Sequence, residues 1–170
     1  MPDSSTMGGR RALATIVFTD VVGCSTHMGQ HEERALIAVQ RDLALMRQLC
    51  ERYEGWAVKE IGDALMMHFS SAVKAVECAQ AIQLAIATQA RQLPPDSLVL
   101  QHRIGMHLGD VLIDDHDVRG DGVNIAARCR VPPSPVRSIF PRLCAMRFQR
   151  STTKQRSRSA VVASKISIHP

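Results

Sequence analysis

The 170-residue sequence lacks several features that mark specialised classes of protein. No apolar run approaches the roughly 20 residues of a membrane-spanning helix, and the polar N-terminal residues lack the apolar core of a secretory signal. The five cysteines are odd in number and include no CxxC pair, which argues against a disulfide framework and against a zinc site. We therefore expect a cytoplasmic protein without a membrane segment, whose thiols are mostly buried or incidental.

Acidic residues are absent after residue 128, although the whole chain carries 16 of them. Residues 129–170 hold nine of the 21 Lys and Arg, which leaves 12 basic against 16 acidic residues before them, or −4 within a total of +5. This break predicts a disordered leader (1–10), one acidic domain (11–128) and a basic tail (129–170). Because the tail has no amphipathic stripe and no aromatic residues besides Phe140 and Phe148, we expect no nucleic-acid partner.

The first apolar segment, residues 13–18, predicts a short buried strand that ends next to Asp20. A carboxylate at the tip of a buried strand is a candidate site residue. Asp also commonly begins loops, so the structural interpretation of Asp20 stays open beside the functional one. Gly23 predicts a turn after this strand, and Ser25 and Thr26 are the expected N-cap of the following helix.

Two later segments show the apolar spacing of amphipathic helices. The first is expected to end at Glu54 and Gly55. The second is expected to begin after a Ser70–Ser71 cap and to stop at residues 93–95, Leu-Pro-Pro. The apolar stripes predicted to face the core are Leu36, Val39, Leu43, Met46, Cys50 and Tyr53 in the first helix, and Val73, Val76, Ala79, Ile82 and Ile86 in the second.

Between these helices, residues 56–61 and 64–69 predict two strands joined by a Gly-Asp turn. Lys59 and Asp63 then lie around one hairpin, although a Gly-Asp turn also occurs for purely geometric reasons. Residues 98–108 alternate like a strand, and Gly109 and Asp110 predict a turn into a further strand, residues 111–113. The order of elements predicts an α/β class (α+β sandwich) with its helices on one face of a mostly antiparallel sheet.

The last segment of the acidic domain contains Asn124 and Arg128 in an Ala-rich run. Residues four apart on a helix share one face, so these two side chains can reach the same ligand. As an isolated pair they are equally compatible with a solvated helix surface.

The segments FTDVVGCST, KEIGDALMMHF, HRIGMHLGDV and DVRGDGVNIAAR, in this order and at these separations, resemble the catalytic domain of bacterial class III adenylate/guanylate cyclases. The resemblance covers Ala12 to Arg128. It implies a ferredoxin-like βαββαβ core and a head-to-tail homodimer whose sites lie between the subunits.

The resemblance also implies roles for seven residues. Two are metal-binding carboxylates joined by a backbone carbonyl, two read the purine, one orients the ribose and one stabilises the pentavalent phosphate. In that order they are Asp20 and Asp63 with Val21, Lys59 and Asp117, Asn124, and Arg128.

Elementary chemistry agrees with these roles. Cyclising a triphosphate requires the 3′-hydroxyl to attack the α-phosphorus, a reaction that two Mg²⁺ or Mn²⁺ ions on paired carboxylates promote. The exocyclic amine and ring nitrogen of adenine complement an Asp acceptor and a Lys donor, so Lys59 with Asp117 predicts ATP as substrate. The leading hypothesis is therefore an adenylate cyclase that makes cyclic AMP and pyrophosphate for signal transduction.

The resemblance ends at Arg128, because residues 129–170 lack the Leu-rich helix end, the Ala-Glu-Pro-Gly-Gly turn and the further strands of the family. We expect a tail that does not complete the sheet, as a change of reading frame would produce. A divergent but folded C-terminal segment is the other interpretation. The alternative function is a catalytically impaired cyclase-like module for binding or dimerisation.

Overall fold

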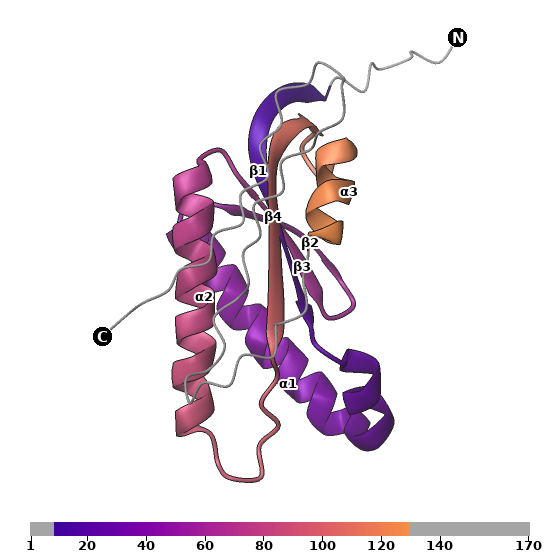
Figure 1. Cartoon of the computed structure of the whole chain (residues 1–170), viewed down its shortest axis with the longest axis vertical. Helices are drawn as coiled ribbons and strands as arrows, with labels where there is room; N and C mark the ends of the chain where they lie inside the picture. The colour runs from indigo at the N-terminus through magenta and orange to yellow at the C-terminus, as the bar shows by residue number, and fades with distance from the viewer. Residues whose placement is uncertain (1–8, 130–170) are drawn as a thin grey trace.

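The computed structural model describes residues 9–129. Five strands and three helices follow one another in this part of the chain (Figure 1). They are β1 (Arg10–Val21), α1 (Cys24–Arg52), β2 (Trp56–Ile61), β3 (Ala64–Phe69), α2 (Ala72–Gln92), β4 (His102–Ile113), β5 (Val118–Arg119) and α3 (Asp121–Arg128).

The strands form one antiparallel sheet in the order β2-β3-β1-β4-β5. The first six elements are therefore a βαββαβ unit of the ferredoxin-like kind, as the resemblance implies. The hairpin of β2 and β3 has the predicted bounds, with Gly62 in the left-handed conformation (φ 64°) at its turn. β1 lies at the centre of the sheet and pairs along its whole length with β4.

Two apolar clusters lie on opposite faces of the sheet. Val17 belongs to the larger cluster, to which α1 and α2 contribute, whereas its neighbours Ile16 and Phe18 belong to the smaller cluster, which includes Ala126 of α3. Figure 1 accordingly shows α3 across β1 and β4 from α2. The expectation that all helices cover one face is correct for α1 and α2 and wrong for α3.

The predicted turn at Gly109 and Asp110 is wrong, because both residues lie inside the continuous strand β4. Ala14 pairs with Gly109, and Leu13 pairs with Asp110. Close packing within the sheet favours glycine at position 109, because a Cβ there would lie 2.6 Å from Nε2 of the buried His107 and the imidazole would have to shift. The sequence signal was therefore real, but packing rather than a change of chain direction produced it.

The second helix begins and ends as predicted, whereas the first begins earlier. Ser71 caps α2 by accepting a hydrogen bond from the backbone N–H of Lys74 (3.4 Å), and the helix stops at Leu93. In α1 the N-cap is Gly23, in a left-handed conformation without a side-chain hydrogen bond, so the Ser25–Thr26 cap is wrong.

Both predicted helix stripes include a residue that does not reach the core. Leu36 of α1 is 45% exposed and Val73 of α2 is 66% exposed. Small residues one position away from the predicted stripe, Ala35 and Ala75, are buried instead.

Most of the expected leader and tail, residues 1–10 and 129–170, lies outside the described residues. Within the described part, Arg10 already belongs to β1, and Cys129 is the C-cap of α3. Neither α1, α2 nor α3 combines the length and the apolar character needed to cross a lipid bilayer.

Candidate active site

Two of the predicted carboxylates meet at the end of β1. Asp20 and Val21 are the last two residues of this strand, and the backbone N–H of Val21 donates a hydrogen bond to Oδ2 of Asp63 (2.7 Å). Asp63 follows Gly62 in the turn between β2 and β3. Asp20 and Asp63 are 43 positions apart in sequence, but the fold brings both next to Val21.

Asp20 forms an ion pair that the sequence did not reveal. Nε of Arg103 lies 2.7 Å from Oδ1 of Asp20, and a terminal nitrogen of the same guanidinium lies 2.6 Å from Oδ2. The hydrogen bonds that Arg103 donates to Asp20 are the largest cause that raises the pKa of Arg103, and the charges of Asp20 and Asp63 add to them. The only sequence signal was a basic residue in an alternating strand, because its partner follows from the pairing of β1 with β4.

The two residues predicted to read the purine are in contact. Nζ of Lys59, on β2, lies 2.6 Å from Oδ1 of Asp117, just before β5. The same oxygen accepts a hydrogen bond from the backbone N–H of Val118 (2.8 Å). The hydrogen bond from Lys59 is the largest cause of a lowered pKa at Asp117, so this carboxylate is held as an anion.

Asn124 and Arg128 lie on α3 with exposed side chains. Their spacing of four residues on one helix places them on the same face, as predicted. Within residues 9–129, neither side chain forms a hydrogen bond or an ion pair with Asp20, Asp63 or the Lys59–Asp117 pair. One copy of the chain therefore brings together the carboxylates and, separately, the purine pair, but does not join α3 to either through polar contacts.

Strand register places these groups on one face of the sheet. Phe18 pairs with Met66, and Met66 pairs with Lys59, so the three side chains point to the same face. Asp20 follows Phe18 by two residues and shares that face. Phe18 and Met66 belong to the smaller apolar cluster, to which α3 also contributes. The face not covered by α1 and α2 thus carries Asp20 and Lys59, with Asp117 in contact with Lys59.

Cys24, the first residue of α1, borders the two carboxylates. Its partial burial raises the pKa of the thiol, and the charge of Asp63, a hydrogen bond to Asp63 and the charge of Asp20 raise it further. At neutral pH the thiol is therefore neutral, and it adds no negative charge beside Asp20 and Asp63.

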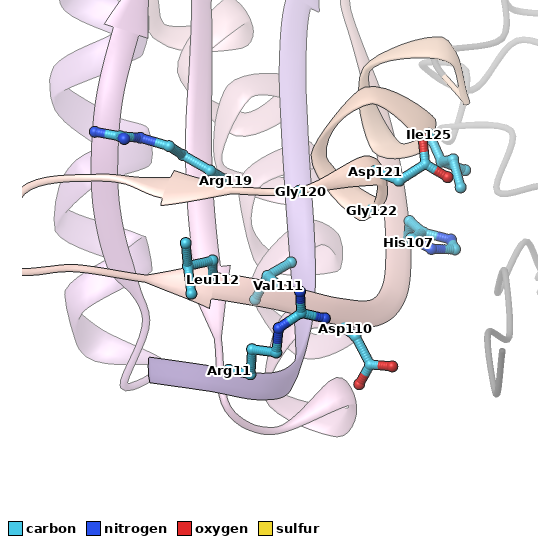
Figure 2. A pocket seen from close by; sticks show the side chains of 10 residues that line it. All are labelled: Arg11, His107, Asp110, Val111, Leu112, Arg119, Gly120, Asp121, Gly122 and Ile125. Carbon is cyan, nitrogen blue, oxygen red and sulfur yellow. The ribbon is translucent and has the colours of Figure 1, made fainter. Parts of the chain in front are cut away.

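A pocket of about 320 Å³ lies beside α3 and is lined by residues of β1, β4, β5 and the first turns of this helix (Figure 2). Its charged lining residues are Arg11, Asp110, Arg119 and Asp121. None of the seven predicted site residues lines this pocket. It is therefore distinct from the carboxylate pair and from the purine pair.

The fold and the site together define a class of protein: a ferredoxin-like α+β domain with acidic residues at the end of its central strand. Residues 9–133 match the family model of the adenylate and guanylate cyclase catalytic domain. The chain therefore belongs to this family, the class III nucleotide cyclases.

Individual relatives agree with the family. The Rhizobium meliloti (strain 1021) protein assigned as adenylate cyclase 3 is 39% identical over 127 residues, which cover 74% of this chain and 22% of the relative. The serine/threonine-protein kinase pkn2 of Myxococcus xanthus is 31% identical over 113 residues, which cover 65% of this chain and 13% of the kinase. The chain thus spans about a fifth of the first relative and about an eighth of the second.

A solved structure of a bacterial light-regulated adenylyl cyclase has the same fold, with a TM-score of 0.69. It is 23% identical, and the match covers 75% of this chain and 42% of that chain.

Proposed function

We propose that this chain is an adenylate cyclase domain that converts ATP to cyclic AMP and pyrophosphate, using two divalent metal ions. One observation carries the proposal. Lys59 and Asp117, 58 residues apart in sequence, lie 2.6 Å apart on the sheet face that also bears Asp20. A donor and an acceptor for a purine edge thus share a surface with carboxylates that suit a metal-bound triphosphate.

The donor set at the end of β1 fits Mg²⁺ or Mn²⁺. Asp20 and Asp63 offer hard carboxylate oxygens on either side of Val21, whose backbone carbonyl is a further oxygen donor. Among the described residues no group of three His, Cys, Asp or Glu could hold a metal ion. Proteins commonly bind Mg²⁺ through one or two carboxylates while waters and substrate phosphates supply the other ligands, and Asp20 and Asp63 could provide that pair.

When bound, such ions would lower the pKa of the 3′-hydroxyl and neutralise charge on the leaving pyrophosphate. The chain's own residues would position the nucleotide. Asn124 would hold the ribose through its side-chain amide, and Arg128, one helical turn further, would donate hydrogen bonds to the phosphate oxygens as negative charge develops on them. Their exposure on α3 leaves both side chains free to reach a ligand.

The Lys59–Asp117 pair supports adenine over guanine. Adenine presents a donor at its exocyclic amine and an acceptor at the neighbouring ring nitrogen, which an Asp acceptor and a Lys donor can satisfy. Guanine presents the opposite order, so a lysine would face a donor and an aspartate would face an acceptor.

We further propose that two copies assemble head to tail to complete the site. In one copy Asn124 and Arg128 form no hydrogen bond or ion pair with the carboxylates or with the purine pair within the described part of the chain. A second copy facing the same sheet surface would bring its α3 to the carboxylates of the first. Sedimentation of the full chain tests this directly, because a strictly monomeric and active protein would contradict it.

The metal assignment is tested by incubating purified protein with ATP and Mn²⁺ and measuring cyclic AMP and pyrophosphate. Asp20→Ala and Asp63→Ala should each abolish the product, whereas Asp96→Ala, at an exposed position after α2, should leave it unchanged. Activity that persists in both site variants would contradict the assignment. A dimer that binds ATP without forming product would instead favour the catalytically impaired module.

The purine assignment is tested by the double variant Lys59→Glu with Asp117→Ala. Each base edge would then face an unmatched group, so transition-state stabilisation for ATP should fall by roughly 1–3 kcal/mol, which lowers kcat/KM about 5- to 150-fold. Arg91→Glu with Asp96→Ala is the matched control, since both positions are exposed and distant in sequence from the site. Equal use of ATP and GTP by the wild type, or an unchanged ATP preference in the double variant, would refute the assignment.

A further inference from the structure

Arg103 contacts both carboxylate oxygens of Asp20, a residue that the proposed function assigns to metal binding. The two residues lie directly opposite each other, Asp20 at the end of β1 and Arg103 near the start of β4. The guanidinium reaches Oδ1 and Oδ2 at 2.7 and 2.6 Å. This two-pronged geometry is the strong form of an arginine–carboxylate pair, and the register of the sheet fixes it.

The pair is sheltered from water. The side chain of Asp20 is 12% exposed and that of Arg103 is 27% exposed. Bulk water therefore screens the interaction only in part, so the pair is worth more than one on the open surface. The nearby cation on the same face, Lys59, contacts Asp117 instead. Arg103 thus contributes positive charge beside the carboxylates next to Val21, through hydrogen bonds to Asp20 and through its interaction with the charge of Asp63.

We propose that Arg103 is a positioning residue that competes with the divalent ion for Asp20 and keeps the metal affinity of the nucleotide-free chain low. A metal ion would bind the carboxylate oxygens that the guanidinium now contacts, and the two positive charges repel each other when both lie against Asp20. Binding of the ion would therefore weaken the two charge-assisted hydrogen bonds and displace Arg103 from Asp20. The inference rests on the proposed assignment of Asp20 to metal binding, which a separate experiment tests.

The test measures Mn²⁺ binding to the full chain without nucleotide, from the electron paramagnetic resonance signal of the free ion. Arg103→Gln should bind Mn²⁺ at least about tenfold more tightly than the wild type, because Asp20 is then released from its charged partner. Arg103→Lys keeps the charge but cannot form the two-pronged contact, so its affinity should lie between the two. Arg91→Gln, in the exposed last turn of α2, removes the same charge elsewhere and should leave binding unchanged.

The gain must also depend on Asp20. In the double variant Asp20→Ala with Arg103→Gln, the extra affinity should disappear. A merely structural role for Arg103 would give weaker Mn²⁺ binding or none, together with a lower melting temperature by circular dichroism. If Arg103→Gln fails to fold, Arg103→Lys carries the test, because its intermediate gain is then the expected result and wild-type affinity refutes the proposal.

Two results overturn the inference: Arg103→Gln that binds Mn²⁺ no more tightly than the wild type, or a gain that survives removal of Asp20. If Arg103→Gln binds Mn²⁺ no more tightly than the wild type, but the chain has cyclase activity that needs Asp20 and Mn²⁺, only the competition by Arg103 is rejected and the proposed function stands. A tenfold gain that depends on Asp20, in a chain that makes no cyclic AMP, would support the competition and reject the proposed activity.

Discussion

Replacing Asp42 by Asn should destabilise the domain more than any exposed substitution, although Asp42 lies outside the proposed site. Its side chain is 0% exposed in α1 and accepts hydrogen bonds from three directions. Nε of Arg41 lies at 2.8 Å, Nε2 of Gln89 on α2 at 3.1 Å, and Nε2 of His102 at the start of β4 at 2.9 Å. One carboxylate therefore ties both helices to the sheet.

The magnitude follows from what Asn leaves behind. Asn keeps the size of Asp42 but loses the charge and turns one acceptor into a donor that faces other donors. Removing one partner from a buried charged cluster costs about 3–5 kcal/mol, and part of this is recovered because a neutral amide is cheaper to bury. We expect the free energy of unfolding to fall by about 3 kcal/mol, a large share of the roughly 5–15 kcal/mol typical of a domain.

The cost should also depend on pH. Burial by itself would raise the pKa of Asp42, but the hydrogen bonds from His102 and Arg41, together with their charges, outweigh it and lower the pKa. A carboxyl whose pKa is lower in the folded state stabilises the fold above its unfolded pKa of about 3.9, and this contribution is lost as the pH falls through the folded value. The difference in the free energy of unfolding between wild type and Asp42→Asn should therefore be largest at pH 7 and shrink below about pH 4.

Urea unfolding followed by circular dichroism at pH 7 and at lower pH measures this gap. Asp96→Asn, the same substitution at an exposed position after α2, is the control. A loss at Asp42 within about 0.5 kcal/mol of this control would refute the argument from burial. A gap that widens as the pH falls would refute the argument from the pKa.

Two further predictions concern packing around the sheet. Gly109→Ala places a Cβ 2.6 Å from Nε2 of the buried His107 and should lower the free energy of unfolding by about 1–3 kcal/mol. Gly29→Ala, in α1 with open space around it, should cause no such loss, and equal urea midpoints for the two variants would contradict the prediction. Burial raises the pKa of both Cys50 and Cys78 to about 12, so Ellman's reagent at pH 8 should label neither thiol until urea unfolds the protein. Mass spectrometry identifies the labelled cysteines, and rapid labelling of either thiol in the native chain would show that the core opens.

Much of the fold follows from local signals in the sequence. The strand-like segments on either side of the Gly-Asp turn predicted β2 and β3 with their observed bounds, and Ser71 and Leu93 predicted the ends of α2. Such signals succeed because a cap or a tight turn depends on residues within a few positions of each other. Gly109 shows where they fail, since the same residue serves a tight turn or a close packing contact, and only the neighbouring chain decides which.

The candidate site depends on a different kind of information. The resemblance to the family singled out Lys59 and Asp117, but their contact arises because β2, at one edge of the sheet, and the segment before β5, at the other, both reach the face opposite α1 and α2. Arg103 had no signal of its own, because an arginine in an alternating strand is ordinary. Its importance comes from the pairing of β1 with β4, which places it opposite Asp20. A shift of that register by one residue would turn Arg103 to the helix-covered face and leave Asp20 without its partner, so the charge balance of the proposed metal site is a property of strand pairing.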